Sequence, residues 1–340
     1  MSYQITLQGS GQQYNAKAYE TILESAIQAG INLPYGCKNG ACGSCKGTVI
    51  SGDVDHGDHA SGALSDTEKT AGKALFCCAR PLSDLTIDCR EIQSNAIPAR
   101  ILPVRVEKKE QLCDDVIALY LKLPSSERLQ FKAGQYLEFL LKDGKRRAFS
   151  LANAPHVDQL IELHLRLIPG GQFTEYVFNE MPEKTIMRIE APLGSFYLRE
   201  ASDKPIIMVA GGTGFAPLKG IVEYMLHENI KRPITFYWGA RARKDLYMAA
   251  LPTAWAAEHP QIQFIPVLSD ALPEDAWQGR TGLIHQAVLD DIGHLAGYEV
   301  YCCGAPAMVE VAHKSFVAAG LAEDDFYSDA FSYAKPTPTP

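Results

Sequence analysis

The chain has 340 residues, of which 46% are hydrophobic and 21% charged, and its formal net charge is −8. This length favours two or three domains over one, and the composition is that of a globular protein in water. The negative charge argues against nucleic acid as a partner. No stretch reaches the roughly eighteen apolar residues of a membrane-spanning helix, so we expect no membrane association.

The nine cysteines of the chain indicate a reducing compartment. The first residues, MSYQITLQGSGQQ, contain neither a basic segment nor an apolar run, and therefore predict no signal peptide. Without export, thiols serve metals or catalysis rather than disulfides. We therefore expect a cytoplasmic, multidomain redox protein.

Residues 1–92 are predicted to form the first domain. Tyr3–Leu7 alternates as a strand, and Thr21–Glu24 reads TILE, a capping box that opens a helix. Thr48–Ile50 and Leu85–Ile87 are further strands. A few strands with one helix and a long glycine-bearing loop make a small α+β domain.

That loop carries the first chemical signal. Cys37, Cys42 and Cys45 have the spacing C-x4-C-x2-C, and Cys77 and Cys78 follow downstream. Thiolates bind zinc or iron–sulfur clusters, and this spacing is the plant-type run for a 2Fe–2S cluster. A structural zinc site usually has two short C-x2-C units instead. The loop resembles the 2Fe–2S ferredoxin family, which implies a β-grasp fold and Cys77, rather than Cys78, as the fourth metal ligand.

The rest of the chain is predicted to hold two more domains. Residues 93–100 lack periodicity and are interpreted as a linker, and alternating runs over 101–200 indicate an antiparallel β-barrel. From 204 to 332, apolar strands alternate with helical segments, which indicates a doubly wound α/β domain. The tail 333–340 is rich in proline and is expected to be disordered.

Two motifs in the barrel point to a flavin. Arg147–Ser150, RAFS, resembles the R-x-Y-S motif of the ferredoxin–NADP reductase superfamily, with phenylalanine in place of tyrosine. The resemblance implies that Arg147 neutralises FAD phosphate, Phe149 packs on the flavin ring and Ser150 hydrogen-bonds flavin N5. Gly170–Thr174 opens a helix where the superfamily binds the dinucleotide, which implicates Gly171 and Thr174. Taken alone, these motifs are also compatible with a solvated arginine and an ordinary threonine-capped turn.

Three further segments resemble the nicotinamide domain of the same superfamily. They are 211–217 (GGTGFAP), 237–241 (YWGAR) and 303–308 (CGAPAM). The first departs from the dinucleotide fingerprint because proline replaces the third glycine, yet proline fits the first turn of a helix. The resemblance implies coenzyme contacts from Gly211, Gly212, Thr213, Gly214 and Pro217.

Other implied roles come with less local sequence support. Cys303 would lie beside the nicotinamide ring, although a buried core thiol is the alternative. Arg241 and Arg243 could contact the 2′-phosphate of NADPH, but Asp245 follows a YWGAR segment that resembles NADH-using members. We therefore expect NADH, since a carboxylate often contacts the ribose in NADH sites. Phe331 in SDAF would close over the flavin, although an ordinary edge strand is the alternative.

The order of ferredoxin, flavin barrel and nicotinamide domain is that of oxygenase reductases, and it implies electron flow from NADH through FAD and 2Fe–2S to a separate protein. In detail the chain resembles the CDP-6-deoxy-Δ3,4-glucoseen reductase family, on RAFSLANAP, IELHLRLIPGGQFTEYVFNE and FYSDAF. The acceptor would then be a pyridoxamine-phosphate-dependent dehydrase. The alternatives are an oxygenase component as acceptor, or a zinc-holding module with a decayed reductase body.

Overall fold

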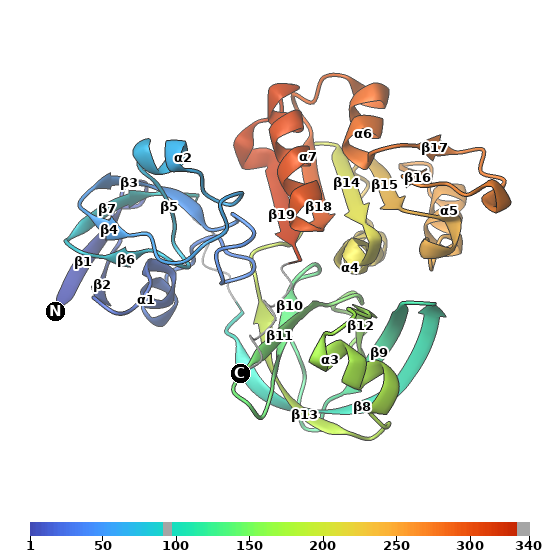
Figure 1. Ribbon diagram of the computed structural model, residues 1–340, viewed down its shortest axis with the longest axis horizontal. Coiled ribbons are helices and arrows are strands. Elements are labelled where there is room, and N and C mark those ends of the chain that lie inside the picture. The colour runs from blue at the N-terminus through green and yellow to red at the C-terminus, as the bar shows by residue number, and fades with distance from the viewer. Residues whose placement is uncertain (91–96, 332–340) are drawn as a thin grey trace. The chain divides into compact units, whose positions relative to one another are not determined.

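The computed structural model describes residues 1–90 and 97–331 (Figure 1). The chain divides into two compact units. Of the described residues, the first unit holds 1–90 with Gly194–Phe196 and 328–331, and the second holds the remainder. Residues 93–96 of the predicted linker at 93–100 and all of the predicted tail at 333–340 lie outside the described residues, and strand β8 already begins at Arg100.

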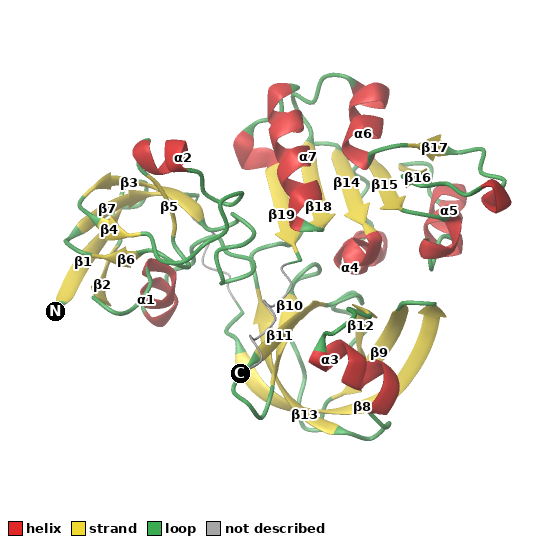
Figure 2. Ribbon diagram, viewed as in Figure 1, coloured by secondary structure: helices red, strands yellow, loops and turns green. Residues whose placement is uncertain are grey.

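The first unit contains a mixed five-stranded sheet in the order β2-β1-β7-β3-β5, with a separate two-stranded sheet of β4 and β6 (Figure 2). Its elements are β1 (Ser2–Leu7), β2 (Gln13–Lys17), α1 (Ile22–Gln28), β3 (Lys46–Ser51), β4 (Val54–Asp55), α2 (Asp66–Thr70), β5 (Lys73–Leu75), β6 (Arg80–Pro81) and β7 (Leu85–Asp88).

Helix α1 begins where the sequence predicts. The Thr21 hydroxyl accepts a hydrogen bond from the Glu24 amide, and the Glu24 carboxylate accepts one from the Thr21 amide. The apolar face of α1 packs into the core of this unit through Ile22, Leu23 and Ala26. Capping and hydrophobic burial therefore act together to fix the helix that precedes the cysteine loop.

The second unit begins with an antiparallel barrel in the order β11-β10-β13-β8-β9-β12. Its elements are β8 (Arg100–Cys113), β9 (Val116–Lys122), β10 (Tyr136–Leu140), β11 (Arg146–Ser150), β12 (Ile161–Arg166), α3 (Gln172–Glu175) and β13 (Ile186–Leu193). Leu151 bridges Leu163, which joins the end of β11 to β12 and closes the barrel. Helix α3 continues as a π-helical turn over Tyr176–Glu180.

The second unit ends with an α/β layer whose sheet order is β17-β16-β15-β14-β18-β19. Its elements are β14 (Ile206–Gly211), α4 (Phe215–His227), β15 (Ile234–Ala240), α5 (Ala250–Glu258), β16 (Ile262–Leu268), β17 (Arg280–Thr281), α6 (Ile284–Ile292), β18 (Glu299–Gly304), α7 (Pro306–Ala318) and β19 (Phe326–Ala330). Helices α6 and α7 cover one face of the sheet, and α4 and α5 the other (Figure 1). Strands β14 to β18 pair in parallel, as the alternation predicts.

Across the described parts of the chain, no helix has the length and hydropathy needed to cross a membrane.

Candidate functional site

The cysteine loop lies between α1 and β3, and its four predicted ligands form two pairs. The thiols of Cys37 and Cys42 share a hydrogen bond, and so do those of Cys45 and Cys77. Cys77 also lies close enough to Cys37 to interact with it electrostatically. A 2Fe–2S cluster takes four thiolates distributed over two irons, so this paired arrangement fits a two-iron cluster.

Backbone amides around the loop point at sulfur. The amide of Cys37 lies 3.4 Å from Cys42 Sγ, and that of Ala41 lies 3.4 Å from Cys37 Sγ. The hydrogen bond from the Cys42 thiol lowers the pKa of Cys37 to about 7, with help from the amides of Asn39 and Ala41. A metal ligand must be a thiolate. The same contact, together with burial, raises the pKa of Cys42 well above its usual range, so Cys37 is the thiol of this pair that ionises more readily.

Close packing explains one glycine of the loop. Gly40 has φ +74°, and a Cβ there would lie 2.7 Å from Cys78 Sγ and 2.9 Å from His59 Cβ. A larger residue would therefore displace the turn between two predicted ligands.

Within residues 1–90 and 97–331, no three His, Cys, Asp or Glu side chains are arranged to hold a single metal ion.

Two distant segments join the first unit at this same loop. The Ser195 hydroxyl donates to the Tyr35 carbonyl at 2.9 Å and accepts from the Tyr35 amide at 3.0 Å. The Ser44 hydroxyl donates to the Ser328 carbonyl at 3.3 Å. These contacts span 160 and 284 residues of sequence, so no local pattern could predict them.

The two flavin motifs meet in the barrel. Phe149 at the end of β11 packs on Phe173 of the glycine turn, with ring centroids 5.7 Å apart, and edge-on to Phe139 at 5.9 Å. Ser150 is buried beside them, whereas the Arg147 guanidinium donates to the Arg146 carbonyl. The structure therefore brings the RAFS and GGQFT segments together around one aromatic cluster.

The glycine turn itself is held by Thr174. Its hydroxyl accepts from the Ile168 amide at 3.1 Å and donates to the Gly171 carbonyl at 3.1 Å. A Cβ on Gly171 would lie 2.8 Å from that hydroxyl. Thr174 thus stabilises its own turn, and its proposed contact with FAD stays a prediction.

The nicotinamide motifs converge at the carboxyl edge of the parallel sheet. Strand β14 has β15 on one side and β18 on the other, and the chain order reverses there, which is where doubly wound sheets bind ligands. The backbone of Gly214, just before α4, lies against the Cys303 carbonyl so closely that no Cβ fits. Gly211 meets Met308, whose sulfur would lie 2.5 Å from an added Cβ. Pro217 lies in the first turn of α4.

The other predicted site residues have mixed surroundings. Asp245 accepts from the Ala242 amide at 3.1 Å, so its carboxylate stabilises its own turn. Cys303 is fully buried at the end of β18, as is its neighbour Cys302. Phe331 directly follows β19 and is half-buried. Their roles toward NADH and FAD remain predictions.

The structure adds Arg166, which the sequence analysis did not single out. Its Nη1 pairs with Asp115 at 3.1 Å, whereas its Nη2 is buried and has no hydrogen-bond partner among the described residues. Nη2 lies 3.2 Å from the position that a Cβ on Gly212 would take. A buried unpaired cation at a glycine loop is suited to an anionic ligand. The alternation of Ile161–Arg166 was the available signal, since it places every second residue away from the barrel core.

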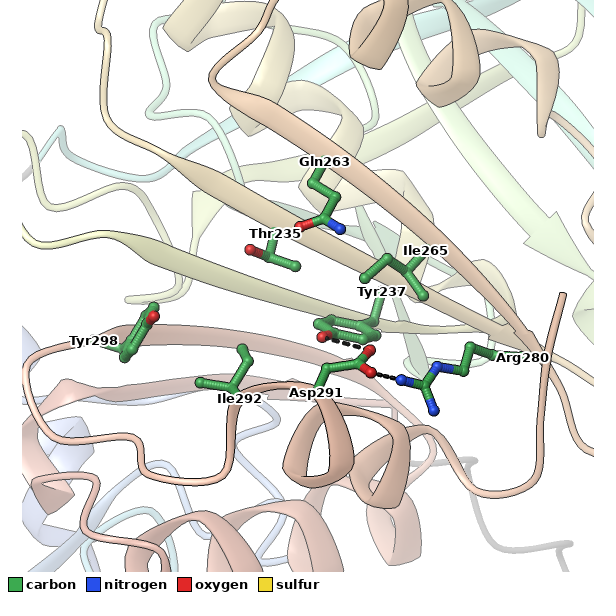
Figure 3. Close-up of a pocket in the computed structure, with 8 residues that line it drawn as sticks. All are labelled: Thr235, Tyr237, Gln263, Ile265, Arg280, Asp291, Ile292 and Tyr298. Atoms are coloured by element: carbon green, nitrogen blue, oxygen red, sulfur yellow. Dashed lines mark hydrogen bonds and ion pairs between the residues drawn. The ribbon is translucent and has the colours of Figure 1, made fainter.

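A polar pocket of about 670 Å³ lies on the α6 face of the α/β layer (Figure 3). Tyr237 donates to Asp291 at 3.1 Å, and Asp291 also pairs with Arg280. These polar groups satisfy one another. The pocket lies under the end of α6 and contains none of the predicted coenzyme residues.

Three domain families match the chain. Residues 5–82 match the 2Fe-2S iron-sulfur cluster binding domain, residues 103–197 the oxidoreductase FAD-binding domain, and residues 208–314 the oxidoreductase NAD-binding domain. These matches confirm the predicted fold class and the predicted cofactors 2Fe–2S, FAD and NADH.

Full-length relatives share the same domain order. The chain is 38% identical over 336 residues to CDP-6-deoxy-L-threo-D-glycero-4-hexulose-3-dehydrase reductase of Yersinia pestis, covering 98% of this chain and 100% of that one. It is 34% identical to reductase component 2 of terephthalate 1,2-dioxygenase from Comamonas sp, covering 98% of both chains. The crystal structure of Amycolatopsis cytochrome P450 reductase GcoB superposes with a TM-score of 0.77 at 34% identity, covering 97% of this chain and 98% of that one.

The thiol pairs give a prediction for the fourth metal ligand. Cys77 shares hydrogen bonds with both Cys45 and Cys78, whereas the Cys78 sulfur bonds Cys77 at 3.6 Å and lies against Gly40. We expect Cys77→Ser to lose the cluster and Cys78→Ser to keep it, as measured by iron content and visible absorbance of the purified variants. Iron retained by Cys77→Ser but lost by Cys78→Ser would reverse the assignment.

The unpaired nitrogen of Arg166 gives a second prediction. Arg166→Ala should raise the KM for NADH on the order of tenfold, since a charge-assisted contact to the coenzyme is lost. Arg166→Lys retains the charge and should show a smaller rise. Steady-state kinetics with a small dye as electron acceptor would measure both, with flavin content as the control for folding. An unchanged KM in Arg166→Ala would contradict a coenzyme contact.

Proposed function

Because this chain belongs to the 2Fe–2S flavoprotein reductases of the ferredoxin–NADP reductase superfamily, we propose that it supplies electrons to the dehydrase step of CDP-linked deoxysugar synthesis. Its class as an NAD(P)H-dependent oxidoreductase follows from that membership. The proposal concerns the acceptor, a pyridoxamine-phosphate-dependent dehydrase that acts on a CDP-linked 6-deoxysugar. The full-length similarity to a dehydrase reductase is the observation that carries it. We place the reaction in the cytoplasm, where nine cysteines remain reduced.

Each cofactor has a defined place in this scheme. When bound, FAD would supply the chemistry of hydride acceptance from NADH, and the cluster would supply one-electron transfer. Arg147 binds the flavin phosphate and Ser150 offers a hydrogen bond at N5. Gly171 and Thr174 form the turn that receives the dinucleotide, and Phe331 covers the flavin.

The carboxyl edge of the parallel sheet in the α/β layer binds NADH. The backbone of Gly211–Gly214 and the start of α4 at Pro217 receive the pyrophosphate, since a helix N-terminus attracts anions. Arg166 adds positive charge to that site, and Cys303 lies at the nicotinamide end. Asp245 orders the loop that faces the ribose. Cys37, Cys42, Cys45 and Cys77 hold the cluster through which electrons leave.

An oxygenase component is the second candidate acceptor. The similarity to a terephthalate dioxygenase reductase and to a cytochrome P450 reductase favours it, because both serve oxygenases according to their names. A reconstituted system decides between the two. We expect NADH-dependent turnover of the CDP-sugar with purified dehydrase and none with an aromatic-ring dioxygenase component. Turnover with the dioxygenase alone would overturn the proposal.

The order of electron flow gives a third prediction. Cys42→Ser removes a cluster ligand in the first unit, so the variant should still oxidise NADH with a small dye but lose turnover of the dehydrase. Cys78→Ser is the matched control and should retain both activities. Full dehydrase turnover by a cluster-free Cys42→Ser protein would show that electrons leave directly from the flavin.

A fourth prediction concerns the coenzyme. Asp245 is nine-tenths buried and orders the turn after β15. That turn also carries the two arginines that could meet the phosphate of NADPH. However, Arg243 Nη1 donates to the Asp275 carbonyl at 3.2 Å, and Arg241 Nε lies 4.0 Å from the Asp245 carboxylate. We therefore expect a higher kcat/KM for NADH than for NADPH in the dye assay. Equal or better kcat/KM for NADPH would refute this preference.

A further inference from the structure

Strand β12 has an apolar face in the barrel core and an opposite face that carries ionisable side chains. Leu163 and Leu165 are fully buried in the barrel core, whereas Glu162, His164 and Arg166 alternate with them and point to the other side. Successive polar side chains on one face of a strand lie about 7 Å apart. The barrel therefore presents a row of ionisable groups. Glu162 and His164 contact the α/β layer, whereas Arg166 pairs with Asp115 of the barrel.

Glu162 makes the first contact with the α/β layer. Its carboxylate pairs with Lys219 of α4 at 3.0 Å. Lys219 also contacts Glu223 at 3.0 Å and the carbonyl of Ala152 at 3.2 Å, so its three hydrogens have three acceptors. Its side chain is only 7% exposed. Although burial opposes ionisation, the hydrogen bond from His164 and the charge of Lys219 hold the pKa of Glu162 at about 2.

His164 makes the second contact with the α/β layer. Burial lowers the pKa of His164, so the neutral ring carries one hydrogen. Nε2 lies 2.9 Å from the Glu162 carboxylate, which can only accept, and Nδ1 lies 3.0 Å from the Tyr247 hydroxyl. Nε2 therefore donates to Glu162, and Tyr247 donates to Nδ1. One buried imidazole thus connects the barrel to the loop after β15.

Tyr247 connects the polar side chains of β12 to the glycine loop at Gly212. Its ring packs edge-on to Trp238 with centroids 5.1 Å apart. Trp238 stacks on Phe215 at 4.0 Å, and its indole nitrogen donates to the Gly212 carbonyl at 2.9 Å. The backbone that is proposed to bind NADH is therefore connected through two rings to side chains of the flavin barrel.

We propose that Glu162 and His164 are positioning residues that hold the nicotinamide domain in a fixed orientation relative to the flavin barrel for hydride transfer. A buried ion pair adds little net stability compared with apolar packing, but a pair whose partners belong to different domains fixes their orientation. Hydride transfer requires this fixed geometry, since a misplacement of about 1 Å can cost on the order of 10²-fold in rate. The inference rests on flavin reduction by NADH and is independent of the protein acceptor.

Tyr247→Phe tests the hydrogen bond to His164. We expect the limiting rate of flavin reduction at saturating NADH to fall on the order of tenfold in stopped-flow measurements. The KM for NADH should stay within about twofold, because the change leaves the glycine loop intact, and FAD content should be unchanged. Tyr237→Phe is the matched control, since its hydroxyl bonds Asp291 within the nicotinamide domain (Figure 3), and it should reduce flavin at the wild-type rate.

Glu162→Gln tests the ion pair, with Glu299→Gln as its control. Glu299 pairs with Arg232 at 2.8 Å, and this pair is as buried as that of Glu162 but lies within the nicotinamide domain. Labelling with an amine-reactive reagent, read by mass spectrometry on protein with and without FAD, supplies a measurement independent of activity. Lys219 should become reactive in Glu162→Gln and in Tyr247→Phe but stay protected in both controls, while the exposed Lys314 reports equal labelling throughout.

Three outcomes would overturn the proposal. The first is a wild-type limiting rate in Tyr247→Phe and Glu162→Gln together with protected Lys219. The second is an equal loss of rate in the controls, which would indicate general destabilisation instead of positioning. A raised KM at an unchanged limiting rate would likewise contradict positioning, since it would make these residues part of the coenzyme site.

Discussion

The alternation of side chains along β12 constrains the second unit on both of its sides. The same six residues complete the barrel core with Leu163 and Leu165 and offer Glu162 and His164 to the α/β layer. A shift of one residue in the pairing of β12 with β9 would exchange the two faces. It would expel leucines from the core and bury carboxylate and imidazole within it. The register of one strand thus determines both the integrity of the barrel and the partner of Lys219.

In the first unit, the four cysteines predicted to bind the cluster differ in their burial. Cys45 and Cys77 belong to the hydrophobic core of this unit, while Cys37 and Cys42 lie nearer the surface. Two of the predicted ligands are therefore held by packing, and the other two lie in the loop itself. Gly40 lies between the predicted ligands, where neighbouring side chains leave no space for a Cβ.

Relatives that serve a dehydrase and relatives that serve oxygenases match the chain over nearly its whole length. The iron–sulfur, FAD-binding and NAD-binding families all match this chain, yet relatives whose names give different acceptors match it over the same length. Function at the level of the reaction therefore follows from the motifs, whereas the acceptor requires reconstitution with candidate partners.

The sequence by itself determined the domain classes, the thiol spacing, the helix start at Thr21 and the glycine segments at strand ends. These are local features, fixed by backbone preference and by periodicity over a few residues. The tertiary structure decided which distant groups meet. The pairing of Cys45 with Cys77, the docking of Ser195 and Ser328 at the cysteine loop, and the unpaired nitrogen of Arg166 depend on contacts across tens to hundreds of residues. The polar residues of IELHLR were visible as an alternation, but a strand pattern states only that one face avoids the core. Which charges that face meets depends on how a second domain packs against it, and no local preference encodes that choice.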